Sequence, residues 1–190
     1  MTERTHSTQI AILGSAEPGS VAHDLAGAAG TLIAQCGMTL ISGCGSPATR
    51  YAAECAVAAG GPVLSILPDA QMPELSWPAT IVLPSGMGAA RNLLMALAGD
   101  GCIVIGGRAG TKSEVNLAWL HGRPLLPLVG HGGWSDCLPE SPPDERGSAP
   151  IWPWASLSDL RLALQRVAEG RGDLARLNAI APAGSSSAAT

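Results

Sequence analysis

The fold is decided by residues 101–124, which read GCIVIGGRAGTKSEVNLAWLHGRP. Residues 102–105 form a short, wholly apolar run that is rich in β-branched residues and is followed by two glycines. This run predicts a strand that is buried on both faces. A helix is predicted to begin with Thr111 as its N-cap, because Glu114 then falls at the third helical position, where a capping box places it. The stretch therefore predicts a strand, a glycine loop and a helix in succession.

The loop between this strand and this helix is a candidate anion site. Gly106, Gly107 and Gly110 allow the chain to turn tightly and leave backbone N–H groups open to a ligand. At a helix start these N–H groups and the positive end of the helix dipole point the same way. Two readings of Glu114 stay open at this point: it is the partner of Thr111 in a capping box, or it is a carboxylate that acts on the ligand.

Strands and helices alternate along the rest of the chain. Strands are predicted over residues 9–15, 38–42, 63–67, 81–83, 102–105 and 125–129, and helices over about 21–36, 47–59, 93–98 and 158–169 besides the one that follows Thr111. This order predicts an α/β protein with a Rossmann-like three-layer fold, in which a mostly parallel, doubly wound sheet has six to seven strands. We expect a single domain over residues 9–170, a flexible N-terminus over 1–8 and a largely disordered C-terminal tail over 171–190.

Ligands of such sheets bind beyond the carboxyl ends of the strands, near the point where the strand order reverses. Four glycine-bearing loops are predicted to meet at that edge. They contain the candidate ligand-binding residues Gly14, Ser15, Gly43, Gly45, Ser46, Gly86, Met87, Gly88, Asn92, Gly106, Gly107, Arg108, Ala109, Gly110 and Thr111. Their convergence indicates a nucleotide or another phosphorylated ligand.

Two further side chains at this edge carry chemistry. Arg91 is predicted in the first turn of a helix, where a cation opposes the helix dipole. An arginine in that position either holds an anionic ligand or pairs with an acid of the same protein. His131 lies in a glycine loop after the sixth predicted strand, where it either contacts a ligand or is solvated.

The composition excludes several classes of protein. The chain has 190 residues, a formal net charge of −4 and no basic cluster, which argues against nucleic acid as its main partner. No apolar run is long enough to cross a bilayer, and the polar start lacks a signal-peptide core, so we expect a cytoplasmic protein. No cluster of metal ligands is present in the sequence, so no metal or obligatory cofactor is predicted.

Two motifs resemble a known family. Gly86-Met87-Gly88-x-x-Arg91-Asn92, followed by a strand and Gly-Gly-x-x-Gly-Thr-x-x-Glu, is similar to the pattern of the LOG (lonely guy) superfamily, whose members are often mislabelled lysine decarboxylases. The resemblance covers roughly residues 9–134. Within the superfamily, the Gly-Met-Gly-x-x-Arg-Asn motif looks most like the branch that includes molybdenum-cofactor carrier proteins.

The resemblance implies a Rossmann-like fold, a homo-oligomer (dimer or tetramer) and a nucleoside monophosphate bound at the strand carboxyl ends. LOG enzymes hydrolyse the N-glycosidic bond of a purine 5′-monophosphate to free base and ribose 5-phosphate. By this resemblance Arg91 and Glu114 match the catalytic pair. Gly107, Gly110 and Thr111 match the phosphate-binding loop.

The sequence differs from the LOG enzymes at three places. Gly106 stands in place of a proline and Arg108 in place of a loop glycine, where it supplies an additional cation for a phosphate. Asn92 replaces a lysine, and residues 43–47 replace a longer run of glycines.

Three functional hypotheses follow. The first is a nucleoside 5′-monophosphate phosphoribohydrolase. The second is a non-catalytic carrier of the molybdenum cofactor or another pterin phosphate, and the third is an interaction module that kept only the fold.

Overall fold

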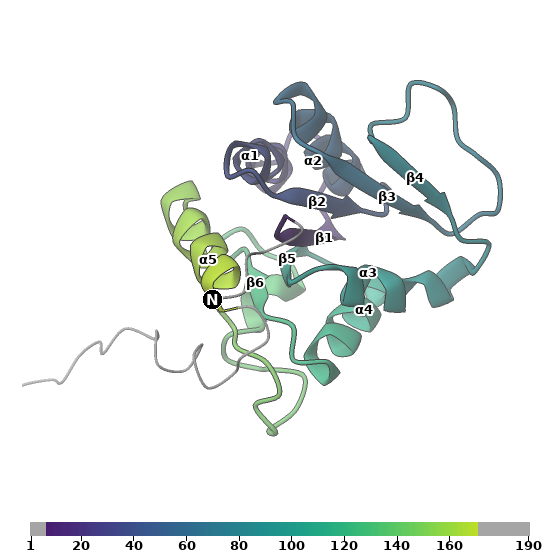
Figure 1. Ribbon diagram of the computed structural model, residues 1–190. Helices are drawn as coiled ribbons and strands as arrows, with labels where there is room; N and C mark the ends of the chain where they lie inside the picture. Colours follow the sequence, from purple (N-terminus) through teal and green to yellow (C-terminus); the bar gives the residue numbers. More distant parts are fainter. Residues whose placement is uncertain (1–6, 171–190) are drawn as a thin grey trace, which may run out of the picture.

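A six-stranded, all-parallel sheet forms the centre of the computed structural model, which describes residues 7–170 (Figure 1). The strands are β1 (Gln9–Ser15), β2 (Thr39–Ser42), β3 (Val63–Leu67), β4 (Ile81–Pro84), β5 (Gly101–Gly106) and β6 (Leu125–Pro127). Their order in the sheet is β4-β3-β2-β1-β5-β6. This arrangement confirms the predicted Rossmann-like α/β fold.

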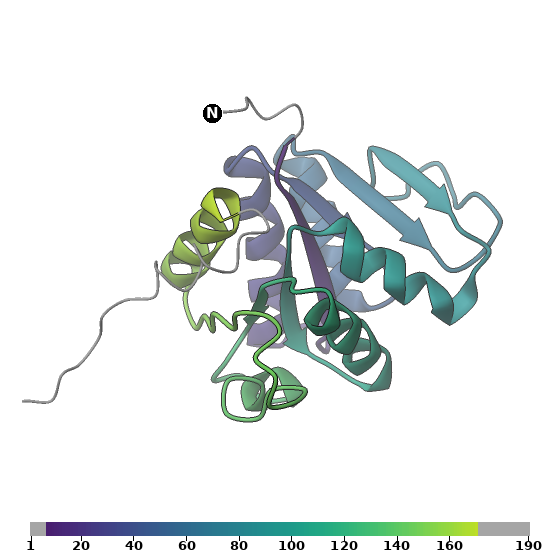
Figure 2. The same cartoon turned by 60° about the horizontal axis from the view of Figure 1, so that its bottom comes forward.

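Helices cover both faces of the sheet. They are α1 (Val21–Gln35), α2 (Pro47–Ala58), α3 (Asn92–Ala98), α4 (Ala109–Leu120) and α5 (Leu157–Glu169), with the 3-10 turns η1 (Gly88–Arg91) and η2 (Trp134–Cys137). Helices α1, α2 and α5 pack on one face, and α3 and α4 pack on the other. Figure 2 shows α3 and α4 in front of the sheet and α1 and α2 behind it. The fold therefore has three layers.

The central strands are buried on both faces, which explains their unbroken apolar sequences. In β1, Ile10 and Ile12 contribute to the core under α1 and α2, while Ala11 and Leu13 contribute to the core under α3 and α4. Residues 102–105 of β5 are all at most 1% exposed. Alternate side chains thus fill two separate cores, so residues 10–13 of β1 and 102–105 of β5 are all apolar.

The strand order reverses at β1, which pairs with β2 on one side and with β5 on the other. The chain leaves β1, β2 and β5 at the same edge of the sheet and continues from each into a helix. A crevice at this reversal is where ligands bind in open α/β sheets. The topology therefore brings the predicted glycine loops together, as the pattern of elements indicated.

Helix α4 begins three residues earlier than predicted. Arg108 occupies the N-cap position without a side-chain hydrogen bond to the helix, and the first helical residue is Ala109. Thr111 is therefore the third helical residue and not the N-cap. The prediction of a capping box between Thr111 and Glu114 is wrong, because the backbone at Arg108 turns into the helix without help from a hydroxyl.

The connection after β6 returns to pair with that strand. Leu125 and Leu128 form parallel bridges with Ile151 and Trp154, and the Trp154 indole N–H donates to the carbonyl of Leu126 at 3.0 Å. Trp154 is 1% exposed. This segment therefore pairs along the outer edge of β6 and covers it.

The two predicted terminal segments, 1–8 and 171–190, lie outside the described residues except for Ser7 and Thr8. Within residues 7–170, none of the helices combines the length and the hydropathy that crossing a bilayer requires.

Candidate functional site

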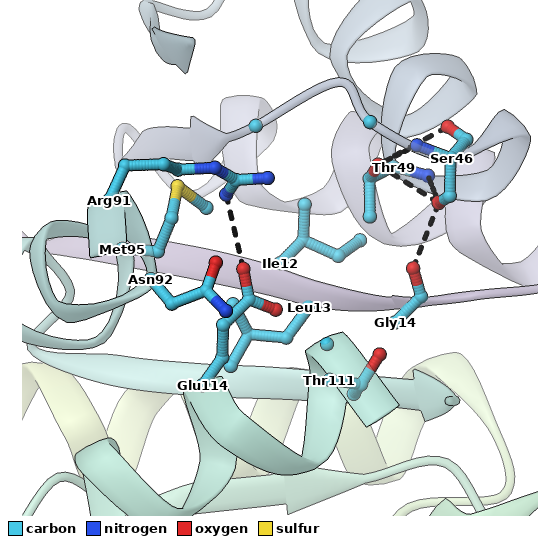
Figure 3. Close-up of a pocket in the computed structure, with 13 residues that line it drawn as sticks. Ile12, Leu13, Gly14, Ser46, Thr49, Arg91, Asn92, Met95, Thr111 and Glu114 are labelled. Carbon is cyan, nitrogen blue, oxygen red and sulfur yellow. Dashed lines mark hydrogen bonds and ion pairs between the residues drawn. The ribbon is translucent and has the colours of Figure 1, made fainter. Parts of the chain in front are cut away.

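An ion pair between Arg91 and Glu114 lies at the carboxyl edge of the sheet (Figure 3). Arg91 ends η1 and immediately precedes α3, whereas Glu114 is on the second turn of α4. Arg91 Nη1 donates to Glu114 Oε1 at 3.1 Å, and the two side chains are 14% and 9% exposed. Of the two readings of Arg91, pairing with an acid of the same protein is the one that the structure contains. Both side chains nevertheless line a pocket that opens at this edge.

Gly43 allows the guanidinium of Arg91 to lie against the backbone of the β2–α2 loop. A Cβ atom at residue 43 would lie 2.4 Å from Nη1 of Arg91, which is far inside van der Waals contact. At Gly45 the nearest atom, Nη2 of Arg91, would be 3.5 Å away, an ordinary contact. A side chain at position 43 would therefore displace the guanidinium of Arg91 from this position.

The pocket has a volume of about 160 Å³. Most of the residues that line it were predicted as ligand contacts or as the catalytic pair: Gly14, Gly43, Gly45, Ser46, Arg91, Asn92, Gly110, Thr111 and Glu114. They come from the end of β1, the loop after β2, the junction of η1 with α3 and the first two turns of α4. Segments that are distant in the sequence thus form one concave surface.

Burial changes the acidity of Glu114. Loss of solvent raises the pKa of its carboxyl from the usual 4.5 to about 7, and the nearby charge of Arg91 opposes part of this rise. The carboxyl therefore changes its protonation state close to neutral pH. A carboxyl with this property, in a pocket and beside a fixed cation, is suited to general acid–base chemistry.

The hydroxyl groups at the start of α2 are used within the protein. Ser46 Oγ donates to the carbonyl of Gly14 at 2.8 Å and accepts from the backbone N–H of Thr49 at 3.2 Å. Thr49 Oγ1 accepts from the backbone N–H of Ser46 at 3.2 Å, which completes a capping box. Ser46 therefore caps α2 and also ties that helix to the end of β1.

The start of α4 has a different character. It has no side-chain cap, and a Cβ atom at Gly110 would meet nothing within 4 Å. Gly107 has a φ of +115°, a conformation that other residues rarely adopt. Backbone N–H groups at an uncapped helix start, with open space in front of them, form a favourable position for an anion.

Other predicted residues lie outside this pocket. Ser15, Gly106, Gly107 and Arg108 line adjacent hollows at the same edge. Gly86, Met87 and Gly88 shape the turn before α3: the N–H groups of Gly86 and Gly88 donate to the carbonyls of Asp69 and Pro68. Ala109 lines none of these hollows.

Sequence reasoning missed four residues that line the pocket: Ile12, Leu13, Thr49 and Met95. Ile12, Leu13 and Met95 carried no signal, because apolar residues in a strand or a buried helix are expected to belong to the core. Thr49 had a usable signal, since it follows the N-cap Ser46 by three residues. No group of three or more histidine, cysteine or acidic side chains that could hold a metal ion occurs within residues 7–170.

Known proteins of similar sequence and structure were compared with this chain. An uncharacterized protein of Archaeoglobus fulgidus is 32% identical over 120 residues, which are 63% of this chain and 79% of that protein. The molybdenum cofactor carrier protein of Chlamydomonas reinhardtii has a TM-score of 0.71 at 23% identity, over 86% of this chain and 99% of that one. The molybdenum cofactor binding protein of Rippkaea orientalis has a TM-score of 0.68 at 23% identity, over 87% and 99%.

A third solved structure has a different partner. DNA processing protein A of Helicobacter pylori, described in a single-stranded DNA binding mode, has a TM-score of 0.64 at 17% identity, over 84% of this chain and 81% of that one. At such identities these likenesses show the fold alone. A family model matches residues 7–146 directly, and on this match the chain belongs to the SLOG cluster4 family.

Proposed function

We propose that this chain binds a phosphorylated small molecule, such as a nucleotide, at the carboxyl edge of its sheet. The phosphate lies at the start of α4, in front of Gly110 and Thr111. Support comes from the uncapped helix start, from the open space at Gly110 and from the cation of Arg108 beside it.

The observation that carries the proposal is the Arg91–Glu114 pair, which is almost fully buried and still lines the pocket. A buried ion pair adds little to the stability of a protein, because the loss of solvent around both charges offsets much of their attraction. A binding site gains from it, since the guanidinium is held in one orientation for a ligand and the carboxyl is kept near its titration point.

A second candidate function is hydrolysis of an N-glycosidic bond, which the raised pKa of Glu114 favours. In this reaction water attacks the anomeric carbon of the ribose 5-phosphate unit, and the bonding electron pair leaves with the base. The base then takes up a proton. The ionised carboxylate of Glu114 would stabilise the oxocarbenium-like transition state and accept the proton of the attacking water, while Arg91 orients that carboxylate.

The alternative to catalysis is a carrier that releases its ligand unchanged. Two of the similar folds are described as a molybdenum cofactor carrier and a molybdenum cofactor binding protein, so a pterin phosphate is the ligand class to test. We also infer that the ligand is a small molecule and not nucleic acid, because the formal net charge of the chain is −4. The single-stranded DNA bound by the Helicobacter pylori protein makes an oligonucleotide the necessary control.

The experiment combines titration calorimetry with product analysis. Adenosine 5′-monophosphate, a pterin phosphate and a single-stranded oligonucleotide are titrated into the wild-type protein, and free base is measured after incubation with nucleoside monophosphates. Hydrolysis predicts base release that Glu114→Gln abolishes and that Glu140→Gln, an exposed acid outside the site, leaves intact. A carrier predicts binding that Arg91→Ala weakens, with no base released. Absence of binding to any phosphorylated compound would refute the proposal.

A further inference from the structure

A second hollow lies on the other side of the loop that we assign to the phosphate. Its volume is about 510 Å³. Three loops surround it: the β1–α1 loop with the first turn of α1, the β5–α4 loop with Arg108, and the β6–η2 loop with His131. These loops follow β1, β5 and β6, which are neighbours in the sheet. The hollow is therefore at the same edge as the Arg91–Glu114 pocket.

The walls of this second hollow are fixed by close contacts. A Cβ atom at Gly133 would lie 2.7 Å from Cα of Gly106, so the two loops approach more closely than any other residue permits. The backbone N–H of Gly106 donates to Ser135 Oγ at 2.9 Å, and the Asp136 carboxylate accepts from the N–H groups of Gly130 and Gly132 at 2.6 and 2.7 Å. The hollow is thus a built feature of the fold.

A third, smaller hollow of about 270 Å³ connects the two. It shares Ser46, Gly110 and Thr111 with the Arg91–Glu114 pocket, and it shares Glu17 and Arg108 with the second hollow. A continuous groove therefore runs along the edge of the sheet, and the start of α4 lies in its middle.

The sizes of the two ends decide where a bulky group fits. Ligand pockets commonly measure about 300–1,000 Å³. The end beside Arg91 and Glu114, with about 160 Å³, falls below this range. The end beside Arg108 and His131, with about 510 Å³, falls within it. With one group of the ligand beside Glu114, a second organic group on the phosphate has room only on the Arg108 side.

Arg108 lies between these two ends of the groove and forms a weak ion pair with Glu17. Its Nη2 donates to Glu17 Oε1 at 3.1 Å, and both side chains are 81% exposed. Exposed ion pairs contribute little to stability, so a phosphate can replace the carboxylate of Glu17 without a large loss. Arginine binds phosphate oxygens through two parallel hydrogen bonds, which are stronger than its single bond to Glu17.

We propose that the ligand carries an organic group on each side of its phosphate, as a dinucleotide does, with the second group in the hollow between Val21, Arg108 and His131. This inference rests on the proposed function, because it places the phosphate at the start of α4. Arg108 holds the phosphate after its release from Glu17, and it thereby selects diphosphate-bridged ligands over monophosphates.

The test compares diadenosine diphosphate with adenosine 5′-monophosphate by titration calorimetry. The wild-type protein is expected to bind diadenosine diphosphate at least about tenfold more tightly, a difference of about 1.4 kcal/mol. Val21→Trp fills the second hollow from an exposed position (60% exposed) and should abolish this difference while leaving the affinity for the monophosphate unchanged. Val57→Trp, on the exposed face of α2 (38% exposed), is the matched control and should leave both affinities unchanged.

The outcomes separate the two proposals. Equal affinity for the two compounds would overturn the role of the second hollow and leave the proposed function intact. Tighter binding of diadenosine diphosphate that survives Val21→Trp would do the same. If neither compound binds, the proposed function itself fails. Tighter binding of a single-stranded oligonucleotide than of diadenosine diphosphate also overturns the inference, since the groove would then serve a polymer.

Discussion

The contact between Gly43 and Arg91 gives a way to move the cation of the site without replacing it. Gly43→Ala places a Cβ 2.4 Å from Nη1 of Arg91, so the guanidinium must shift from its present position beside Glu114. We expect affinity for a phosphorylated ligand to fall by at least about tenfold, or ~1.4 kcal/mol. Titration calorimetry measures the loss. Gly45→Ala, whose Cβ lies 3.5 Å from Nη2, should have a smaller effect. Equal losses in the two variants would contradict the role assigned to Gly43.

The raised pKa of Glu114 predicts how stability depends on pH. Between the unfolded value of 4.5 and the folded value of about 7, the native protein holds a proton that the unfolded chain releases. Stability from this group is therefore present below pH 4.5 and is lost as the pH rises through about 7. Relative to Glu114→Gln, the wild-type protein should lose roughly 2–3 kcal/mol of unfolding free energy between about pH 5 and pH 8. Urea denaturation at several pH values measures this difference, and a difference that does not change with pH would refute the prediction.

Glu114 also shows how much of the position and contacts of a side chain a sequence pattern can predict. The motif placed it correctly on the helix after β5 and at the predicted edge, because the spacing of glycines and apolar residues determines these features. It did not decide whether the carboxylate caps the helix with Thr111 or acts on the ligand. The capping box fails because α4 starts at Ala109, and the partner that the structure provides, Arg91, is 23 residues away. Contacts between distant segments depend on packing that no local pattern encodes.

The first turn of α2 supports the site through Ser46. Ser46→Ala removes the N-cap and also the hydrogen bond to the Gly14 carbonyl, which joins α2 to β1. We expect a loss of about 2 kcal/mol, of which about half comes from the cap. Ser156→Ala in α5 is the matched control, because Ser156 also forms a capping box but has no bond to the sheet among the contacts of its hydroxyl. It should lose only about 1 kcal/mol. Chemical denaturation measures both, and equal losses would contradict a tie between α2 and β1.

Elements with a strong local pattern were predicted most accurately. β5 was predicted over residues 102–105 and extends over Gly101–Gly106, because an apolar run between glycines has one clear reading. β6 was predicted to end at residue 129 but ends at Pro127. The N–H of Leu128 still donates to the Val104 carbonyl of β5 at 2.8 Å, but Leu128 forms only an isolated bridge with Trp154, and the N–H of Val129 donates to the Trp154 carbonyl. A proline- and serine-rich segment gives no sign that its tryptophans will complete the edge of a sheet.

At the scale of the whole molecule, the alternation of strands and helices was sufficient to predict the parallel sheet and its ligand-binding edge. The shape of the groove along that edge could not be predicted, since it depends on how closely the loops approach one another. The close approach of Gly133 to Gly106 is an example. The two glycines belong to different motifs, and their contact forms part of the wall of the second hollow. Such contacts follow from the assembled fold.

The outer edge of the sheet at β4 predicts self-association. Within residues 7–170, β4 lies at the edge of the sheet (Figure 1) and pairs with β3 alone. Its residues Ile81 and Leu83 are 64% and 44% exposed. The only charged residues between positions 70 and 98 are Glu74 and Arg91, and both are paired, with Arg50 and Glu114. Proteins usually protect an open edge strand with charges, and this edge has none of its own. An uncharged, apolar edge is well matched by a second copy of itself.

We therefore expect a homo-oligomer in which two copies of the chain meet at β4. The double variant Ile81→Lys, Leu83→Lys should weaken this association by roughly a hundredfold or more, about 2.7 kcal/mol, because each contact would bury unpaired cations. Sedimentation equilibrium measures the change. Leu162→Lys, at a 57% exposed position on α5, introduces a charge on a different surface and should leave the association unchanged. A monomeric wild-type protein would refute the expected oligomer, and a double variant that associates as tightly as the wild type would place its contact elsewhere than β4. Because η1 and Arg91 follow β4 along the chain, the ligand affinity of the double variant should also be measured and compared with that of the wild type.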